Sequence, residues 1–282
     1  MTAQYWILGF PVSHSLSPAM HNAAFAALDI DARYATHAVE PAKLPAAIDE
    51  LRSLGIAGAN VTVPHKEAVI ALLDAVDPAA RAIGAVNTIV RDGAKLRGYN
   101  TDAPGLCASL LEAGVTLRGS RVVILGAGGA ARAAIVGLGQ AGAAEVVVAA
   151  RRADRAQALA AELSAAAGTL VRGVDMDAGL RQALPTTTLL VQGTSATLIS
   201  DPNAQALADS IPIELLPAAA VVIDLVYKPR VTTLMRRAHQ RGLKTVDGLG
   251  MLLHQGAIAF EHWTSRKPPL SVMRAALEAG LS

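Results

Sequence analysis

Residues 122–132, VVILGAGGAAR, decide the fold. The first four are apolar without alternation, which is typical of a parallel strand buried on both faces. A glycine-rich turn follows and opens a stretch predicted to be helical, which is the context that a dinucleotide-binding fingerprint requires. Gly126 would allow the tight turn, Gly128 would let the backbone approach a pyrophosphate, and Ala131 would let helix and strand pack closely. The alternative is a turn without a ligand, and we favour nucleotide binding because both flanks fit.

The residues after the next predicted strand bear on which dinucleotide binds. An Asp or Glu at the end of that strand would bind the ribose hydroxyls of NAD. Here the strand runs instead into Arg151 and Arg152, and Arg155 follows. Guanidinium groups suit a 2′-phosphate by charge and by bidentate geometry. The run therefore predicts NADP, although Asp154 leaves room for NAD and a solvated basic helix start would have the same sequence.

Short β-branched runs alternate with Ala- and Leu-rich stretches along the rest of the chain. This alternation indicates an α/β fold with parallel sheets covered by helices. The turn-like run Gly98–Asp102 precedes the strand and glycine turn of a new pattern, so we place a domain boundary near residue 102. A last helix is predicted from Gly248 to about Trp263. Strands are predicted at residues 5–8, 59–63, 121–125, 145–149, 188–191 and 220–225, and helices at 18–28, 43–54, 130–141, 153–166 and 231–241.

The composition excludes several classes of protein. The 282 residues carry 25 basic and 23 acidic side chains, a net charge of +2 without a long basic block, so nothing favours nucleic-acid binding. No apolar run is long enough to span a bilayer, and no signal peptide is visible. The single cysteine, Cys107, excludes an internal disulfide and a cysteine-built zinc site. No histidine pair has HExxH spacing. We expect a cytoplasmic, metal-independent globular protein.

Polar residues cluster at four further places. Ser17 is predicted to cap a helix that the next proline begins, which leaves Ser15 unexplained beside a helix N-terminus that could receive a carboxylate. Asn60 and Thr62 are predicted to share one face at the end of a strand, with Lys66 shortly after. Taken singly, each cluster is explained by a cap, a turn or an exposed lysine. Together they suit a small polyhydroxylated acid. The clusters are residues 9–18, Asn60–Lys66, Gly84–Thr88 and Asn100–Asp102.

The ordered motifs resemble those of the shikimate dehydrogenase family over nearly the whole chain. They are Ser15-Leu16-Ser17-Pro18 with His21-Asn22, Asn60–Lys66 (NVTVPHK), Gly84–Thr88 (GAVNT), Asn100–Asp102 (NTD), Gly126–Arg132 (GAGGAAR), Asp224–Tyr227 (DLVY) and Asp247–Gly256 (DGLGMLLHQG). The resemblance implies a Rossmann NADP-binding domain at 103–247. It also implies an α/β substrate domain with a mostly parallel sheet at 1–102 plus 248–282, separated from the first by a cleft that opens and closes.

The same resemblance implies an activity and roles for individual residues. The activity is the reversible NADPH-dependent reduction of 3-dehydroshikimate to shikimate, on the chorismate route to aromatic amino acids, with Lys66 and Asp102 as the catalytic pair. We expect substrate contacts from Ser15, Ser17, Asn60, Thr62, Lys66, Asn87, Asp102, Tyr227 and Gln255. We expect cofactor contacts from Gly126, Ala127, Gly128, Gly129, Ala130, Arg151, Arg152, Arg155, Thr194, Ser195, Leu225, Gly248 and Met251. No metal is expected.

Three stretches depart from the family's usual pattern, all on the cofactor side or its edge. They are Ala150-Arg151-Arg152, Gln192-Gly193-Thr194-Ser195 and Lys228 before Pro229. They bear on the details of NADP affinity more than on the chemistry.

A ketone reduction needs a hydride donor and a proton for the developing alkoxide. The nicotinamide would give the hydride and Lys66 the proton, with Asp102 positioning the lysine.

Two alternatives stay open: a quinate/shikimate dehydrogenase that uses NAD or NADP, and a non-catalytic NADP-binding sensor. A folate-type dehydrogenase would need a larger aromatic-binding pocket, whereas the paired serines fit a small carboxylate. The expected partner is a small-molecule substrate, with no nucleic acid and no membrane, and the protein is expected to be a monomer or a homodimer.

Overall fold

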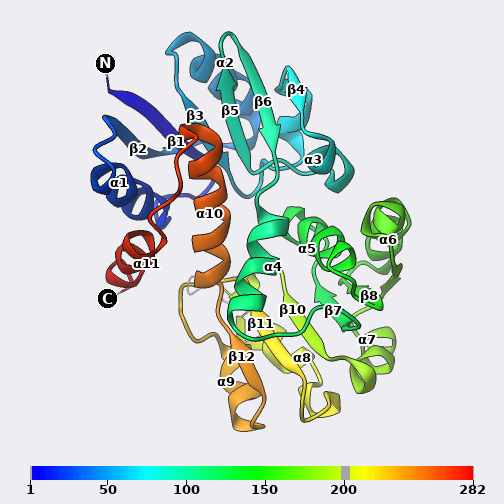
Figure 1. Ribbon diagram of the computed structural model, residues 1–282. Helices are drawn as coiled ribbons and strands as arrows, with labels where there is room; N and C mark the ends of the chain where they lie inside the picture. Colours follow the sequence, from blue (N-terminus) through cyan, green and yellow to red (C-terminus); the bar gives the residue numbers. More distant parts are fainter. Residues whose placement is uncertain (1, 198–203, 282) are drawn as a thin grey trace. The chain divides into compact units, whose positions relative to one another are not determined.

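The computed structural model describes residues 2–197 and 204–281, and the chain divides into two compact units (Figure 1). Unit 1 contains the residues up to Gly105 together with those from Leu253 onward, and unit 2 is Leu106–Leu252. Both units are α/β, as the alternation of strands and helices predicted. None of the described helices has the length and apolar character needed to cross a membrane.

The sheet of unit 2 has the strand order of a Rossmann fold. Its order is β12-β11-β10-β7-β8-β9, and every neighbouring pair is parallel. Counted from β7, this is the doubly wound order 3-2-1-4-5-6, in which ligands bind beyond the carboxyl ends of the strands where the order reverses, here between β7 and β10. The strands are β7 (Arg121–Leu125), β8 (Glu145–Ala149), β9 (Leu170–Val174), β10 (Leu189–Gln192), β11 (Val221–Asp224) and β12 (Lys244–Val246).

Helices and short 3-10 turns cover this sheet. Val123 and Val147 pack with Leu180, Leu190 and Leu234 in one buried cluster, which joins the strands to α7 and α9. Helices α5 and α6 pack on each other and contact β7, β8 and β9. Burial on two sides explains the continuous apolar runs. The helices are α5 (Gly129–Gln140), α6 (Ala153–Ala167), α7 (Ala178–Ala183), α8 (Ala204–Ser210) and α9 (Thr233–Gln240), and the 3-10 turns are η3 (Leu184–Thr186), η4 (Ser195–Thr197) and η5 (Ile213–Leu215).

The sheet of unit 1 is mostly parallel, with one strand reversed. Its order is β2-β1-β3-β5-β6-β4, and β5 runs antiparallel to both of its neighbours. The other neighbouring pairs are parallel. The strands are β1 (Ala3–Gly9), β2 (Ala32–Ala38), β3 (Gly58–Val61), β4 (Ala75–Val76), β5 (Thr88–Asp92) and β6 (Lys95–Tyr99).

Unit 1 has an aliphatic core and an aromatic one. Leu8, Ile48 and Ile89 belong to a buried aliphatic cluster. Tyr5 stacks on Phe25 with ring centroids 5.2 Å apart. The helices are α1 (Ser17–Ala27), α2 (Leu44–Ser53), α3 (Pro78–Ile83) and α11 (Leu270–Ala279), and the 3-10 turns are η1 (Pro41–Lys43) and η2 (Ala68–Leu72). Helices α4 (Asp102–Glu112) and α10 (Leu249–Thr264) have residues in both units.

The prediction of a turn over Gly98–Asp102 is wrong at both ends. Gly98 and Tyr99 close strand β6, and Asp102 begins α4. Gly98 is a strand glycine because its neighbours leave no room for a side chain: a Cβ there would lie 2.6 Å from Leu73 Cδ1 and 2.8 Å from Val86 Cγ2. A glycine inside a strand often marks such a close approach.

Candidate active site

Lys66 and Asp102 form an ion pair in unit 1. Lys66 lies in the loop between β3 and η2, and Asp102 is the first residue of α4. Lys66 Nζ donates to Asp102 Oδ2 at 2.6 Å, and the two side chains are only 14% and 4% exposed. An ammonium has three donors, and Asp102 is the one partner of the Lys66 ammonium among the described residues. The pair is therefore held firmly while the ammonium keeps donors for a further ligand.

Asn87 is the centre of the hydrogen bonds around the carboxylate. Its Nδ2 group lies 2.9 Å from Asp102 Oδ1, 2.9 Å from Thr101 Oγ1 and 3.2 Å from Gln255 Oε1. Its Oδ1 accepts from the Thr101 backbone N–H at 2.7 Å. The second oxygen of Asp102 is thus paired as well, which a buried carboxylate requires. Four segments far apart in the sequence meet at this point.

Gln255 reaches Asn87 because α4 and α10 approach closely. A Cβ at Gly105 of α4 would lie 2.7 Å from both the Cβ and the backbone N of Gln255. Only a residue without a side chain fits there. The glycine on one helix thus allows the amide on the other to join the buried cluster.

The prediction that Ser17 caps α1 is wrong. The helix begins at Ser17 itself, and the residue before it makes no side-chain cap. Ser15 supplies the bond instead, since its Oγ accepts from the Ser17 N–H at 3.2 Å. Pro18 still falls in the first turn, where its missing N–H costs nothing. As a result the Ser17 hydroxyl has no partner among the described residues, and the Ser15 hydroxyl keeps its proton for a ligand.

Asn60 and Thr62 do not play equivalent parts. Asn60 is buried at the end of β3, and its Oδ1 and Nδ2 are both used by neighbouring protein groups. Thr62 is one residue past the strand and half-buried, and its hydroxyl makes no hydrogen bond within the described part of the chain. Of the two, only Thr62 presents a free group.

The glycine turn of unit 2 has the form that the sequence predicted. Gly126 has φ +112°, which only glycine adopts easily, and a Cβ there would lie 2.7 Å from Thr194 Cγ2. Gly128 is the N-cap of α5, and no described atom lies within 4 Å of the place that its Cβ would take. No side chain caps the start of α5, and an uncapped helix N-terminus is where a phosphate would be stabilised.

The three predicted arginines surround the start of α6. Arg152 is its N-cap residue, and Arg151, Arg152 and Arg155 are all exposed. Within residues 2–197 and 204–281 their side chains make no hydrogen bond or ion pair. Asp154 lies in the first turn of the same helix and is also exposed. The guanidinium groups remain available for an anion.

The remaining predicted cofactor residues lie after β10, β11 and β12 and in α10. The buried Gln192 side chain braces the loop after β10, because it donates to Thr194 O and accepts from Thr194 N–H, both at 2.9 Å. Ser195 follows and is exposed. The Leu225 N–H donates to Gln192 O at 3.0 Å. The Gly248 N–H donates to Val226 O at 3.3 Å. Met251 is buried in α10.

Among the predicted substrate residues, Tyr227 stands apart. It lies after β11 in unit 2, whereas the other eight belong to unit 1. Two partners in unit 1, Thr88 and Thr101, were not predicted as site residues. Both are buried and contact the Asn87 side chain. They fall inside the predicted GAVNT and NTD motifs, and that position was the one available signal for them.

Asp224, the first residue of the DLVY motif, is a further buried group that was not predicted as a site residue. Its Oδ1 accepts from Thr197 Oγ1 at 3.0 Å and from the Val226 N–H at 3.1 Å, while Oδ2 has no partner among the described residues. Burial raises the pKa of this carboxyl to about 6. The group lies at the carboxyl end of β11, beside the segment that follows β10.

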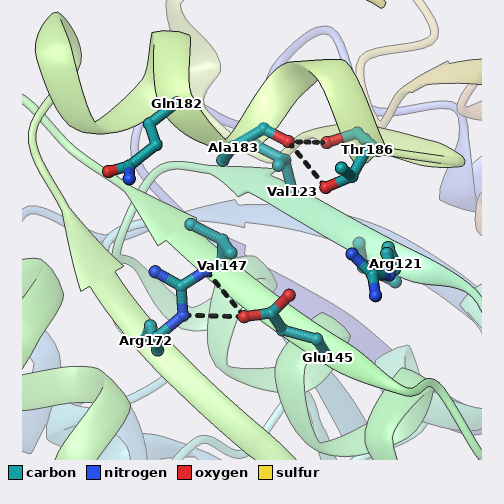
Figure 2. Close-up of a pocket in the computed structure, with 10 residues that line it drawn as sticks. Arg121, Val123, Glu145, Val147, Arg172, Gln182, Ala183 and Thr186 are labelled. Atoms are coloured by element: carbon teal, nitrogen blue, oxygen red, sulfur yellow. Dashed lines mark hydrogen bonds and ion pairs between the residues drawn. The ribbon is translucent and has the colours of Figure 1, made fainter. Parts of the chain in front are cut away.

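A cavity of about 190 Å³ lies elsewhere in unit 2 (Figure 2). It is lined by Arg121 and Glu145, at the amino ends of β7 and β8, and by Arg172, which is paired with Glu145. The glycine turn follows the opposite end of β7, so this cavity is separate from the candidate cofactor site. No group of three or more His, Cys, Asp or Glu side chains in the described residues could hold a metal ion.

These features define a class: α/β proteins with a Rossmann dinucleotide unit and, on another unit, an ammonium–carboxylate pair suited to proton transfer. Three family models match the chain in order. They are the shikimate dehydrogenase substrate binding domain at residues 7–89, shikimate / quinate 5-dehydrogenase at 109–249, and the shikimate 5'-dehydrogenase C-terminal domain at 248–278.

Individual relatives match over almost their full length. Shikimate dehydrogenase (NADP(+)) from Symbiobacterium thermophilum is 51% identical over 278 residues, 98% of this chain and 93% of the relative. The structure of shikimate 5-dehydrogenase from Thermus thermophilus in complex with NADP(H) and shikimate is 40% identical, with a TM-score of 0.87 over 99% of this chain and 100% of that one. Quinate dehydrogenase from Corynebacterium glutamicum in complex with NAD is 31% identical, with a TM-score of 0.87 over 99% of each chain. The chain belongs to the shikimate dehydrogenase family.

Proposed function

We propose that this chain is an NADP-dependent shikimate dehydrogenase, which reversibly reduces 3-dehydroshikimate to shikimate in the biosynthesis of aromatic amino acids. The observation that carries the proposal is the Lys66–Asp102 pair, held at 2.6 Å, with the other oxygen of Asp102 hydrogen-bonded to Asn87. A protein that only sensed NADP would have no use for an ammonium fixed in this way. The name and ligands of the Thermus thermophilus relative support the same substrate and cofactor.

In this proposal Lys66 handles the proton. Its ammonium would stabilise the negative charge that develops on the carbonyl oxygen and then donate a proton to it. Asp102 holds the ammonium in place, and Asn87 holds Asp102. NADPH, when bound, supplies the hydride. In the reverse direction the neutral amine of Lys66 would accept the proton of the alcohol.

We assign substrate binding to polar side chains of unit 1. The hydroxyls of Ser15, Ser17 and Thr62 would bind the carboxylate and a ring hydroxyl, and Gln255 would bind a second one. Support comes from the absence of a protein partner for the Ser17 and Thr62 hydroxyls among the described residues. Asn60 would support the site without binding the substrate directly, because both ends of its amide are already hydrogen-bonded within the protein. Tyr227, which belongs to unit 2, stays a predicted substrate contact.

We assign cofactor binding to unit 2, so that unit 1 is the substrate and catalytic domain. The N-terminus of α5 with residues 126–130 would take the pyrophosphate, and Arg151, Arg152 and Arg155 the 2′-phosphate. The exposed and unpaired state of these arginines within the described chain supports NADP over NAD. Residues Thr194, Ser195, Leu225, Gly248 and Met251 would line the remainder of the site.

An oxidation assay with shikimate and quinate, each with NADP and with NAD, tests the proposal. We expect the highest kcat/KM with shikimate and NADP. A preference for quinate with NAD would favour the second candidate, a quinate/shikimate dehydrogenase, which the likeness to the Corynebacterium glutamicum enzyme makes worth testing. Tight NADP binding without turnover of either acid would overturn both and support a sensor.

Two further proposals concern the setting of the enzyme. We propose that it works in the cytoplasm, where NADPH is kept reduced, and that it is a monomer or a homodimer with a small-molecule substrate as its partner. Cell fractionation and light scattering on the purified chain test these two points.

A further inference from the structure

A buried chain of hydrogen bonds runs from the Lys66–Asp102 pair to Tyr34 on the edge strand β2. Between β2 and β3 lies β1, so the Tyr34 side chain extends across one strand to reach Asn60. The Tyr34 hydroxyl donates to Asn60 Oδ1 at 2.8 Å, and the residue is only 1% exposed. Tyr34 is thus a buried donor at the far end of the cluster, away from the ammonium.

The Tyr34 hydroxyl and the Asn87 carbonyl together fix which way the Asn60 amide faces. With Oδ1 held by the hydroxyl, Nδ2 is directed at Asn87 O and Thr88 Oγ1, both 3.1 Å away. A half-turn of the amide would place its oxygen against the Asn87 carbonyl, where no hydrogen is available. Asn60 and Thr88 are also directly opposite each other across β3 and β5. The amide orientation is therefore passed to the next strand.

Thr88 links the Asn60 amide to the Asn87 amide, which in turn contacts the Asp102 carboxylate. Its hydroxyl, which accepts from Asn60, lies 3.2 Å from Asn87 Oδ1, to which it can donate. The Thr101 N–H donates to the same oxygen. With Oδ1 fixed by these donors, Asn87 Nδ2 must face Asp102 Oδ1. A reversed amide would bring its oxygen against the carboxylate.

We propose that Tyr34 and Thr88 are positioning residues for the reaction: they set the orientation of two successive amides, Asn60 and Asn87, and so keep Asp102 aligned on Lys66. The inference rests on the proposed function. Neither residue is exposed enough to touch a ligand, since Thr88 is 0% exposed. Their effect should therefore fall on turnover and not on substrate affinity.

Tyr34→Phe tests the end of this chain of hydrogen bonds that lies farthest from Lys66, and Tyr5→Phe is its matched control. Tyr5 is the register partner of Tyr34 on β1 and is 6% exposed, and its hydroxyl makes no hydrogen bond in the part of the chain described. We expect Tyr34→Phe to lower kcat for shikimate oxidation about tenfold, the equivalent of one buried hydrogen bond. KM should change less than about twofold. Tyr5→Phe should match the wild type.

Thr88→Val and Thr88→Ser test the middle of this chain of hydrogen bonds. They also test the proposal if the Tyr34→Phe variant does not fold. Valine keeps the shape and loses the hydroxyl, so kcat should fall, whereas serine keeps the hydroxyl and should restore most of it. The double variant Tyr34→Phe/Thr88→Val should lose less than the product of the single losses, because both act through Asn87.

Two results would overturn the inference. One is a kcat within about twofold of wild type in both Tyr34→Phe and Thr88→Val, and the other is a Thr88→Ser variant no better than Thr88→Val. A wild-type chain that turns over neither acid would instead overturn the proposed function, and this inference with it.

Discussion

The two candidate sites differ in how far the protein satisfies its own polar groups. Around Asp102 in unit 1, both carboxylate oxygens and both ends of the Asn87 amide are paired inside the protein. At the glycine turn of unit 2, the N-terminus of α5 and the arginines at 151, 152 and 155 have no partner within the described chain. A group that takes part in the reaction is held in a fixed position before the substrate binds. A group that holds a large anion is left unsaturated, so that the ligand completes it.

The largest effect on turnover should come from removing Lys66 from the ion pair of unit 1. Lys66→Ala should lower kcat by roughly 10²- to 10⁴-fold, as the loss of a general acid–base group does, with a modest change in KM. Steady-state kinetics of shikimate oxidation measure it. Lys95→Ala, at an exposed lysine of β6, is the control and should leave the kinetics unchanged. Turnover near that of wild type in Lys66→Ala would remove the lysine from the mechanism.

The next largest effect should come from the arginines of unit 2, which we propose to bind the 2′-phosphate that distinguishes NADP from NAD. The double variant Arg151→Gln/Arg152→Gln should raise KM for NADP roughly 10- to 100-fold, because solvent screening at these exposed arginines reduces the contribution of each charged hydrogen bond from about 1.5–3 kcal/mol. KM for NAD should stay nearly constant. Arg121→Gln, at an exposed arginine by the amino end of β7, controls for net charge. An equal loss for both dinucleotides would mean that these arginines do not recognise the 2′-phosphate.

Two buried ionisable groups, one in each unit, sharpen the comparison, because each has a polar atom without a partner among the described residues. In unit 1, His21 is fully buried among aromatic rings, and neither ring nitrogen has a partner in the described structure. Burial lowers the pKa of His21 to about 3. The unfolded state then binds the proton first, so stability falls as pH drops below 6.5. Between pH 7 and pH 5 the loss should be about 2 kcal/mol.

His21→Leu should remove this acid dependence. Urea unfolding of wild type and variant at pH 5 and pH 7 measures it. The difference in free energy of unfolding between the two proteins should shift in favour of the variant at the lower pH. The same difference at both pH values would show that the imidazole is protonated or partnered in the folded state.

Asp224 in unit 2 should give a smaller effect of opposite sign. Its pKa is raised, so the folded state binds the proton more tightly, and stability is lost as pH rises through about 6. Relative to wild type, Asp224→Asn should gain about 1 kcal/mol on going from pH 5 to pH 7.5. Urea unfolding at those pH values tests it. A gain toward acid pH instead would show that the carboxylate is stabilised as an anion.

The sequence predicted unit 2 better than unit 1 for a physical reason. Buried parallel strands such as β7 and β8 are apolar throughout, and the glycine turn has a fixed form, so both leave a local signal. The hairpin of β5 and β6 was missed because charged residues such as Arg91 and Lys95 break its alternation. Helix α11 was also missed, and its start at Leu270 follows two prolines.

The contents of the active site were predicted only in part, and mostly by the resemblance. A hydrogen bond between Asn87 and Gln255 joins positions 168 residues apart, and no local pattern reports such a pairing. The cap of α1 was assigned to Ser17 instead of Ser15 because capping depends on where the chain enters the helix, to within one residue. Tyr34 left no local signal, because the partner of its hydroxyl is fixed by the register of three strands.

Gly105 has a consequence for the history of this enzyme. The atoms nearest to its missing side chain include the backbone N of Gln255 at 2.7 Å and its Cα at 2.9 Å. No replacement at position 255 can move those atoms, so no second mutation there can rescue a first one at 105. A new side chain at 255 would leave this contact unchanged, whereas position 105 is closed to every residue larger than glycine unless one of the two helices is displaced.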